Sequence, residues 1–313
     1  MEFMKIITLT LSPCFDVHCY AEDFRTGREN IVRTQSVCLG GKGINVSRAL
    51  LENGFENTAV VAVADQGGAE LCAELDKVGV DYRAIKVSGR VRNNITVHTA
   101  SGKESRICFD DAVGNGAQLL ADVYTALCEL CVGECILAVA GSVPKGVDID
   151  ELCDALASLK QRGVRLVIDS RSFEKSHLSR LRPWLIKPNE QEIGEYAGRE
   201  VTSVEDAVIA AKELRTLGIE NVMVTLGSRG AVLCCDECED GYFLPSPDVK
   251  VRSTIGAGDS TIAGFLAATL TGSSKKRALA LSVCYGSAAC MREGTLPPRH
   301  ADIDALMKAF NDA

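Results

Sequence analysis

Short β-branched runs alternate with longer helix-like segments along this chain, and this alternation limits the possible folds more than any other feature. Strand-like runs occupy residues 5–11, 58–63, 135–140, 165–168, 184–187, 221–226 and 231–234. Helix-like segments occupy residues 44–53, 68–78, 117–131, 149–162 and 203–217, the last of which opens with Ser203 and Asp206 at capping-box spacing. The alternation predicts an α/β fold with a mostly parallel sheet and helices on both faces.

Two insertions interrupt this alternation, at about residues 14–39 and 90–110. Residues 17–20 and 31–34 of the first insertion are strand-like, and the second contains two strand-like runs around residues 101–103. We expect these segments to form a small antiparallel β-sheet. It would act as a lid at the carboxyl edge of the main sheet, where open α/β folds bind their ligands. No repeat or linker divides the sequence, so residues 1–313 are expected to form a single domain with a discontinuous lid.

Composition excludes several classes of protein. A chain of 313 residues that is 46% hydrophobic buries a sizeable core, which excludes a disordered or fibrous protein. No apolar run approaches the roughly 20 residues of a membrane-spanning helix. The N-terminus lacks the pattern of a signal peptide, so we expect a cytoplasmic protein that does not bind membranes. The net charge of -8 argues against nucleic-acid binding.

The chain contains 14 cysteines, a density well below that of disulfide-stabilised domains. We expect most of them to be free, buried thiols. Two clusters have spacings that leave a structural zinc site open as an alternative, although neither has a second CxxC or a nearby His pair: Cys128, Cys131 and Cys135, and Cys234, Cys235 and Cys238.

A glycine-rich segment at residues 254–260 leads into a stretch of small and apolar residues that is expected to be helical. Gly256, Ala257 and Gly258 allow the backbone N–H groups at the helix start to point at one anion, which the helix dipole also favours. In phosphoryl transfer, Asp259 at the rim would orient and deprotonate the attacking hydroxyl. The alternative is an ordinary tight turn with Asp259 as a helix cap.

A second glycine cluster, at residues 40–46, also runs into a helix and places Lys42 and Asn45 at its start. Its spacing fits neither a P-loop nor a dinucleotide fingerprint, and a simple strand-to-helix turn is the alternative. Arg90 and Arg92 alternate along an extended stretch, so both are expected to point to one face, where paired guanidinium groups suit a phosphate. The alternative is that both arginines lie on a strand edge exposed to solvent.

Asn189 and Glu192 follow an apolar run and lie three residues apart on a starting helix, so they share a face. This arrangement suits a magnesium ion held through water. The alternative is a glutamate that interacts only with the helix dipole.

Taken together, these motifs resemble the PfkB branch of the ribokinase-like carbohydrate kinases. The resemblance spans nearly the whole chain through seven ordered segments: residues 11–16, 40–46, 89–94, 141–144, 187–192, 226–231 and 253–260. It implies a ribokinase-like α/β fold with a β-lid, ATP as the phosphoryl donor, Mg²⁺ as its companion and a homodimer formed through the lid.

The resemblance also implies roles for individual residues. Asp259 becomes the catalytic base and the backbone of Gly256, Ala257 and Gly258 the anion hole. The sugar contacts are Asp16, Gly41, Asn45 and Ser142, with Lys42, Arg90 and Arg92 on the phosphate of the substrate and Arg28 as a weaker candidate. The ATP contacts are Lys187, Asn189, Thr225, Gly227, Gly230 and Gly258, flanked by a helix near residues 284–290, and Asn189 and Glu192 reach the metal.

Within the family, Lys42 and residues 90–94 most resemble kinases of ketohexose phosphates. Phe15 and Trp184 favour fructose 1-phosphate as the substrate, with tagatose 6-phosphate as the alternative. A sugar-phosphate sensor without catalysis is a second alternative, against which the presence of Asp259 argues. Ser253 replaces an aspartate found near a monovalent cation in other branches, so potassium dependence is not expected.

Overall fold

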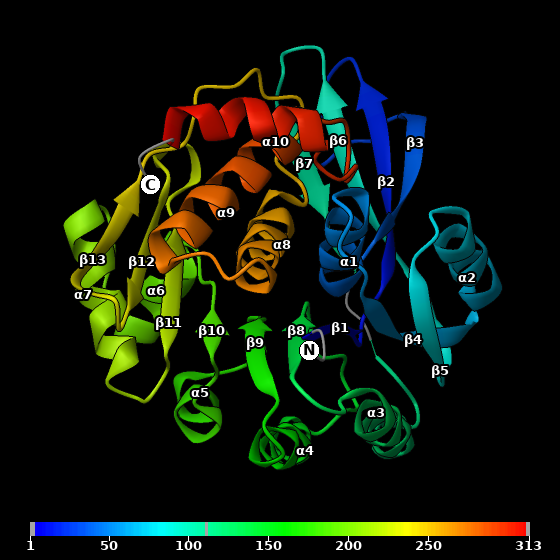
Figure 1. Ribbon diagram of the computed structural model, residues 1–313. Coiled ribbons are helices and arrows are strands. Elements are labelled where there is room, and N and C mark those ends of the chain that lie inside the picture. The colour runs from blue at the N-terminus through cyan, green and yellow to red at the C-terminus, as the bar shows by residue number, and fades with distance from the viewer. Residues whose placement is uncertain (1–3, 110–111, 311–313) are drawn as a thin grey trace.

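Nine strands form the main sheet of the computed structural model, which describes residues 4–109 and 112–310. Adjacent strands are parallel except at β11–β12 and β12–β13. The predicted mostly parallel sheet is therefore confirmed (Figure 1). From one edge to the other the order is β13 (Cys238–Leu244), β12 (Ala231–Cys235), β11 (Asn221–Thr225), β10 (Leu185–Ile186), β9 (Arg165–Asp169), β8 (Cys135–Ala140), β1 (Lys5–Thr10), β4 (Thr58–Gln66) and β5 (Asp81–Arg90).

Helices cover both faces of this sheet, as the alternation predicted (Figure 1). One face packs against α1 (Lys42–Glu52), α2 (Gly68–Lys77), α8 (Ala257–Leu270), α9 (Lys275–Cys290) and α10 (His300–Met307). The other packs against α3 (Gly116–Leu130), α4 (Ile149–Gln161), α5 (Lys175–Leu181), α6 (Glu190–Ala197) and α7 (Val204–Arg215). Because successive side chains of a strand point to opposite faces, Ile136 belongs to one core and Leu137 to the other. A strand that has helices packed on both faces therefore has apolar residues at successive positions of its sequence.

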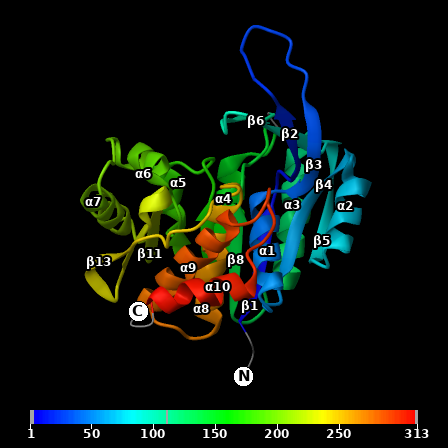
Figure 2. The same ribbon diagram turned by 90° about the horizontal axis from the view of Figure 1, so that it is seen from above.

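A separate four-stranded sheet has the order β3 (Arg33–Gly40), β2 (Cys14–Ala21), β6 (Arg92–Thr99) and β7 (Glu104–Ile107). It comes from two distant stretches of chain, as expected, and extends beyond the main sheet (Figure 2). The expectation that it is antiparallel throughout is wrong, because β2 and β6 pair in parallel. Strand β2 follows β1 along the chain, and β6 follows β5. Because β1 and β5 are parallel within the main sheet, β2 and β6 extend from it in the same direction.

Several boundaries differ from the sequence-based expectations. The strand expected at 31–34 begins only at Arg33, and the one expected at 184–187 shrinks to Leu185–Ile186. The strands β5 and β13 were not predicted, since both are half-exposed and charged, without an apolar run. Asp110, the last residue of the expected lid, lies outside the described residues. The capping box of α7 is confirmed, because Ser203 Oγ accepts a hydrogen bond from Asp206 N and Asp206 Oδ2 accepts one from Ser203 N.

The cysteines are free thiols. The members of both cysteine clusters lie within helices or strands or directly at their ends. Cys131 follows α3 and Cys135 begins β8, while Cys234, Cys235 and Cys238 belong to the β12–β13 hairpin. Within residues 4–109 and 112–310, no helix is both long and apolar enough to cross a membrane.

Candidate active site

The start of α8 lies beside the start of α1, and a buried carboxylate joins the two. Asp259, in the first turn of α8, is 6% exposed, and its Oδ2 accepts a hydrogen bond of 2.8 Å from Asn45 Nδ2 of α1. Burial raises the pKa of Asp259 above its ordinary value, while the nearby Lys42 ammonium and the Asn45 hydrogen bond act in the opposite direction. A carboxylate with a raised pKa is a stronger proton acceptor, which suits a general base.

Both helices begin after a glycine. The N-cap of α8 is Gly256 at φ 80°, and that of α1 is Gly41 at φ 121°, conformations that favour glycine. Among the described residues, neither N-terminus receives a hydrogen bond from a capping side chain. The turn before α8 is held instead by Ser253, whose Oγ accepts a hydrogen bond from Ile255 N. Ala257 N donates to the carbonyl group of Thr254 at 3.4 Å, whereas within the described part of the chain no hydrogen bond from the amide groups of Gly256 and Gly258 is seen, so these two are available to an anion.

Two lysines place positive charge at this junction. Lys42 Nζ lies 3.0 Å from Asp169 Oδ2, and Lys187 Nζ lies 3.4 Å from Asp169 Oδ1. Lys187 also reaches the anion hole, since a Cβ added to Gly258 would lie 3.1 Å from Lys187 Nζ. Burial acts to raise the pKa of Asp169, but the two ammonium groups outweigh it and hold the pKa below its usual value. Asp169 was not identified from the sequence.

A cavity of about 730 Å³ opens beside the anion hole. Five of the six residues expected to contact ATP line it, namely Asn189, Thr225, Gly227, Gly230 and Gly258. The sixth, Lys187, lies at its inner end next to Gly258. The α9 segment near residues 284–290 also contributes to the wall, through Gly286, Ser287 and Cys290. A cavity of this size accommodates a nucleotide.

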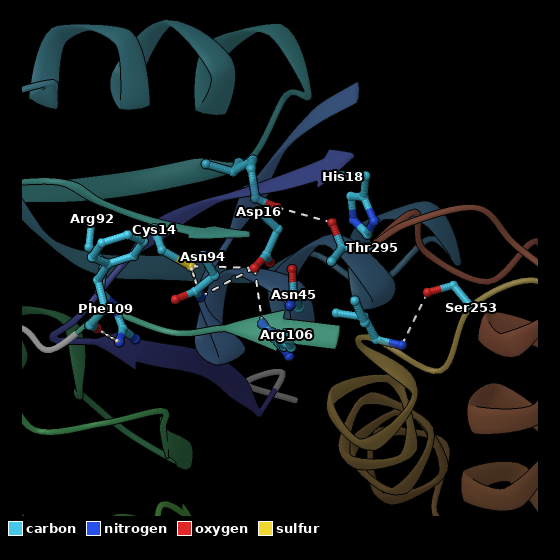
Figure 3. Close-up of polar contacts among 12 residues, drawn as sticks. Cys14, Asp16, His18, Asn45, Arg92, Asn94, Arg106, Phe109, Ser253 and Thr295 are labelled. Carbon is cyan, nitrogen blue, oxygen red and sulfur yellow. Dashed lines mark hydrogen bonds and ion pairs between the residues drawn. The ribbon is translucent and has the colours of Figure 1, made fainter. Parts of the chain in front are cut away.

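Next to the start of α1, the small sheet presents a polar cluster centred on Asp16 (Figure 3). Asp16 Oδ1 accepts hydrogen bonds from Asn94 Nδ2 at 3.2 Å and from Arg106 Nη2 at 3.0 Å. Gly40 makes room for the carboxylate, because a Cβ there would lie 2.5 Å from Asp16 Oδ2. The buried Oδ1 atoms of Asn45 and Asn94 have no partner within the described part of the chain. Unpartnered buried acceptors of this kind suit the hydroxyl groups of a sugar.

Arg90 and Arg92 do not form the expected pair. Arg90 ends β5 in the main sheet and donates to Gln66, whereas Arg92 begins β6 in the small sheet and donates to the carbonyl groups of Phe109 and Ser12. The chain crosses from one sheet to the other at Val91, so the two arginines belong to different strands and different sheets. The structure instead brings Arg106 of β7 to Asp16, a contact between positions 90 residues apart that no local pattern indicates.

Four further residues named in the sequence analysis lie in other parts of the structure. Phe15 is buried in a core cluster with Leu39 and Ile44, behind the sugar-facing side of β2. Trp184 packs edge-to-face on Phe265 within the core, so both aromatic residues are buried and neither is placed to contact a substrate directly. Ser142 follows β8, next to Gly141, whose added Cβ would lie 3.8 Å from the Cβ of Lys42. Arg28 is exposed on the loop between β2 and β3, which projects from the molecule (Figure 2).

Asn189 and Glu192 form a capping box at the start of α6. Asn189 Oδ1 accepts from Glu192 N, and Glu192 Oε2 accepts from Asn189 N, each at 2.9 Å. Glu192 Oε1 accepts from Arg171 Nε at 2.7 Å. Each carboxylate oxygen keeps a second lone pair, so the pair remains able to accept a hydrogen bond from a metal-bound water. Within the described ranges, no group of three or more His, Cys, Asp or Glu residues has the arrangement of a metal site.

Residues 8–302 match the pfkB family carbohydrate kinases. The chain belongs to this family. It is therefore a phosphotransferase that acts on a sugar hydroxyl, and the family implies ATP as the donor.

Curated relatives include the 1-phosphofructokinase of Bacillus subtilis (strain 168), 33% identical over 92% of this chain and 93% of that protein. The ATP-dependent 6-phosphofructokinase isozyme 2 of Escherichia coli (strain K12) is 30% identical over 97% and 98%. The crystal structure of phosphofructokinase-2 from Escherichia coli in complex with substrates and products has a TM-score of 0.88 at 28% identity, over 99% of this chain and 100% of that chain. A ribokinase from Thermotoga maritima, at 19% identity and a TM-score of 0.75 over 98% and 100%, shows the expected ribokinase-like fold.

Replacing Lys42 with Gln tests the electrostatics around Asp259. Asp259 must be ionised to accept a proton, so activity falls as the pH drops through its pKa. Because Lys42 lowers that pKa, its removal is expected to raise the pKa further and move the acid limb of the kcat–pH profile to higher pH. Arg90→Gln, which removes a cation at the sheet edge, should leave the limb in place. An unmoved acid limb in Lys42→Gln contradicts this arrangement.

Proposed function

We propose that this kinase transfers the γ-phosphoryl group of ATP to the free primary hydroxyl of fructose 1-phosphate, giving fructose 1,6-bisphosphate and ADP. The observation that carries the proposal is the buried Asp259 at the uncapped start of α8, between a nucleotide-sized cavity and the polar cluster around Asp16. The relatives named 1-phosphofructokinase support the choice of ketose phosphate.

Each part of the site has one task in this reaction. The Asp259 carboxylate accepts the proton of the attacking hydroxyl, and Asn45 holds that carboxylate in place. The backbone amide groups of Gly256, Ala257 and Gly258 bind the phosphoryl oxygens, on which negative charge is spread in the transition state. Asp16 accepts hydrogen bonds from sugar hydroxyls at the edge of β2.

The phosphate already present on the substrate needs positive charge away from the anion hole. Arg106 and Arg92, both in the small sheet, provide it, and Arg92 Nε is buried without a partner in the part of the chain that the structure describes. Lys42 and Arg90 are less suited to this role, because Lys42 acts on Asp259 and Asp169 at the start of α8 and Arg90 belongs to the main sheet. Mg²⁺ would accompany the phosphates of ATP and neutralise part of their charge, with Asn189 and Glu192 reached through water.

A homodimer through the small sheet is part of this proposal. Apolar residues in and next to this sheet are exposed, with Ile31 at 88%, Val37 at 54% and Phe109 at 48% exposure. An apolar surface of this kind suits burial against a second copy of the chain. Sedimentation analysis is expected to give a dimer for the wild-type chain and a monomer for Val37→Glu, and a wild-type monomer contradicts it.

The substrate is tested by ADP release from MgATP with fructose 1-phosphate, tagatose 6-phosphate, fructose 6-phosphate and unphosphorylated fructose. The proposal predicts the highest kcat/KM for fructose 1-phosphate. A preference for tagatose 6-phosphate or fructose 6-phosphate overturns the substrate but keeps the mechanism. Binding of sugar phosphates without turnover favours a sensor.

In the same assay, Asp259→Asn is expected to bind both substrates and to lose kcat by about 10²- to 10⁴-fold, while Asp240→Asn, at an exposed surface position, keeps full activity.

Arg106→Ala tests the proposed contact between Arg106 and the phosphate of the substrate. Loss of a hydrogen bond from a charged group to the substrate phosphate is expected to raise the sugar-phosphate KM about 10-fold or more and to leave the KM for ATP unchanged. Arg83→Ala, which removes an exposed arginine paired with Glu129 at the far edge of the main sheet, is the matched control. Equal increases in both KM values in Arg106→Ala exclude the assigned role.

A further inference from the structure

One buried carboxylate joins two lysines that come from opposite halves of the site. Asp169 ends β9 in the middle of the main sheet and is 3% exposed. One of its carboxylate oxygens lies 3.0 Å from Lys42 Nζ and the other 3.4 Å from Lys187 Nζ. Its backbone carbonyl accepts a hydrogen bond of 3.0 Å from Gly141 N, at the end of the neighbouring strand β8. The position of the carboxylate is therefore set by the sheet itself.

The two lysines reach the reacting groups from different sides. Lys42 is the first residue of α1, three residues before Asn45, and its charge acts on Asp259. Lys187 follows β10, is 5% exposed, and places its ammonium group against Gly258 of the anion hole. A phosphoryl group bound at the start of α8 would therefore lie within reach of both cations.

We propose that Asp169 is a positioning residue for phosphoryl transfer, which holds Lys42 and Lys187 on either side of the anion hole without touching the substrate itself. This inference rests on the proposed function of the site. Charge on the phosphoryl oxygens is stabilised best by cations that are already in place when the reaction occurs. Lysine side chains are flexible, and two ammonium groups beside one another repel, so a shared counter-ion between them supplies the required order.

The balance of charge supports this role. Lys42, Lys187, Asp169 and Asp259 together carry no net charge, so the site can be buried before the substrates arrive. Burial alone lowers the pKa of Lys42, but the carboxylates of Asp169 and Asp259, and more weakly that of Glu192, raise it above the ordinary lysine value. Asp169 thus helps to keep Lys42 protonated and also holds its ammonium group in position.

Asp169→Asn tests the inference, because it keeps the size of the side chain and removes its charge. We expect kcat to fall about 100-fold, with less than about threefold change in the KM for either substrate. In the wild type the raised pKa of Lys42 places any alkaline limb of the kcat–pH profile above the accessible range. In the variant, burial of Lys42 is opposed by one carboxylate fewer, so this limb should move to lower pH and come into view. A purely structural residue would not move this limb. Wild-type kcat, or an unmoved limb, overturns the inference.

A double variant separates positioning from a general loss of stability. In a Lys42→Gln background, one of the two cations that Asp169 holds is already gone. Asp169→Asn is therefore expected to cost about 10-fold there instead of about 100-fold. The double variant also keeps the cluster neutral, so it remains informative where the single variant unfolds in a thermal melt. Equal losses in both backgrounds contradict positioning, whereas inactivity of the wild-type chain on every sugar phosphate contradicts the proposed function instead.

Discussion

The site depends on the burial of negative charge at the carboxyl edge of a parallel sheet. Asp259 and Asp169 are both almost fully buried, and an isolated buried carboxylate is costly unless positive charge and hydrogen bonds compensate it. Lys42 and Asn45 of α1, together with Lys187 after β10, supply that compensation. The groups that neutralise the buried carboxylates before substrates bind are also those that the proposed reaction uses to stabilise the phosphoryl group. The same contacts therefore contribute to folding stability and to catalysis.

In the proposed function, the two substrates bind to two different parts of the fold. The main sheet and α8 and α9 form the nucleotide-sized cavity, while the small sheet carries Asp16, Asn94 and Arg106 (Figures 1 and 3). Since β2 and β6 continue directly from β1 and β5, the small sheet is anchored to strands of the main one. The sugar-facing groups are thus held close to Asp259 by short, direct connections.

Local patterns were enough to predict the fold class and the glycine-rich helix starts, because strand periodicity, capping and turn residues act over a few positions. Residues 256–259 and 40–45 lie together in the structure as the motifs indicated. Arg106 and Asp169 could not be found this way, since their partners Asp16 and Lys42 are 90 and 127 positions distant. The error on Arg90 and Arg92 has a related cause, as a single residue between them marks the passage from one sheet to another. The core positions of Phe15 and Trp184 could not be predicted in this way, because an aromatic side chain beside a motif residue can point either into the core or into the site.

A crystal structure of the chain with fructose 1-phosphate and a non-hydrolysable ATP analogue tests the central claim most directly. The account predicts that the free primary hydroxyl lies within about 2.6–3.2 Å of the Asp259 carboxylate. It also predicts that the γ-phosphate rests on the amide groups of residues 256–258, between Lys42 and Lys187. A hydroxyl beyond reach of Asp259, or a γ-phosphate bound away from the start of α8, contradicts it.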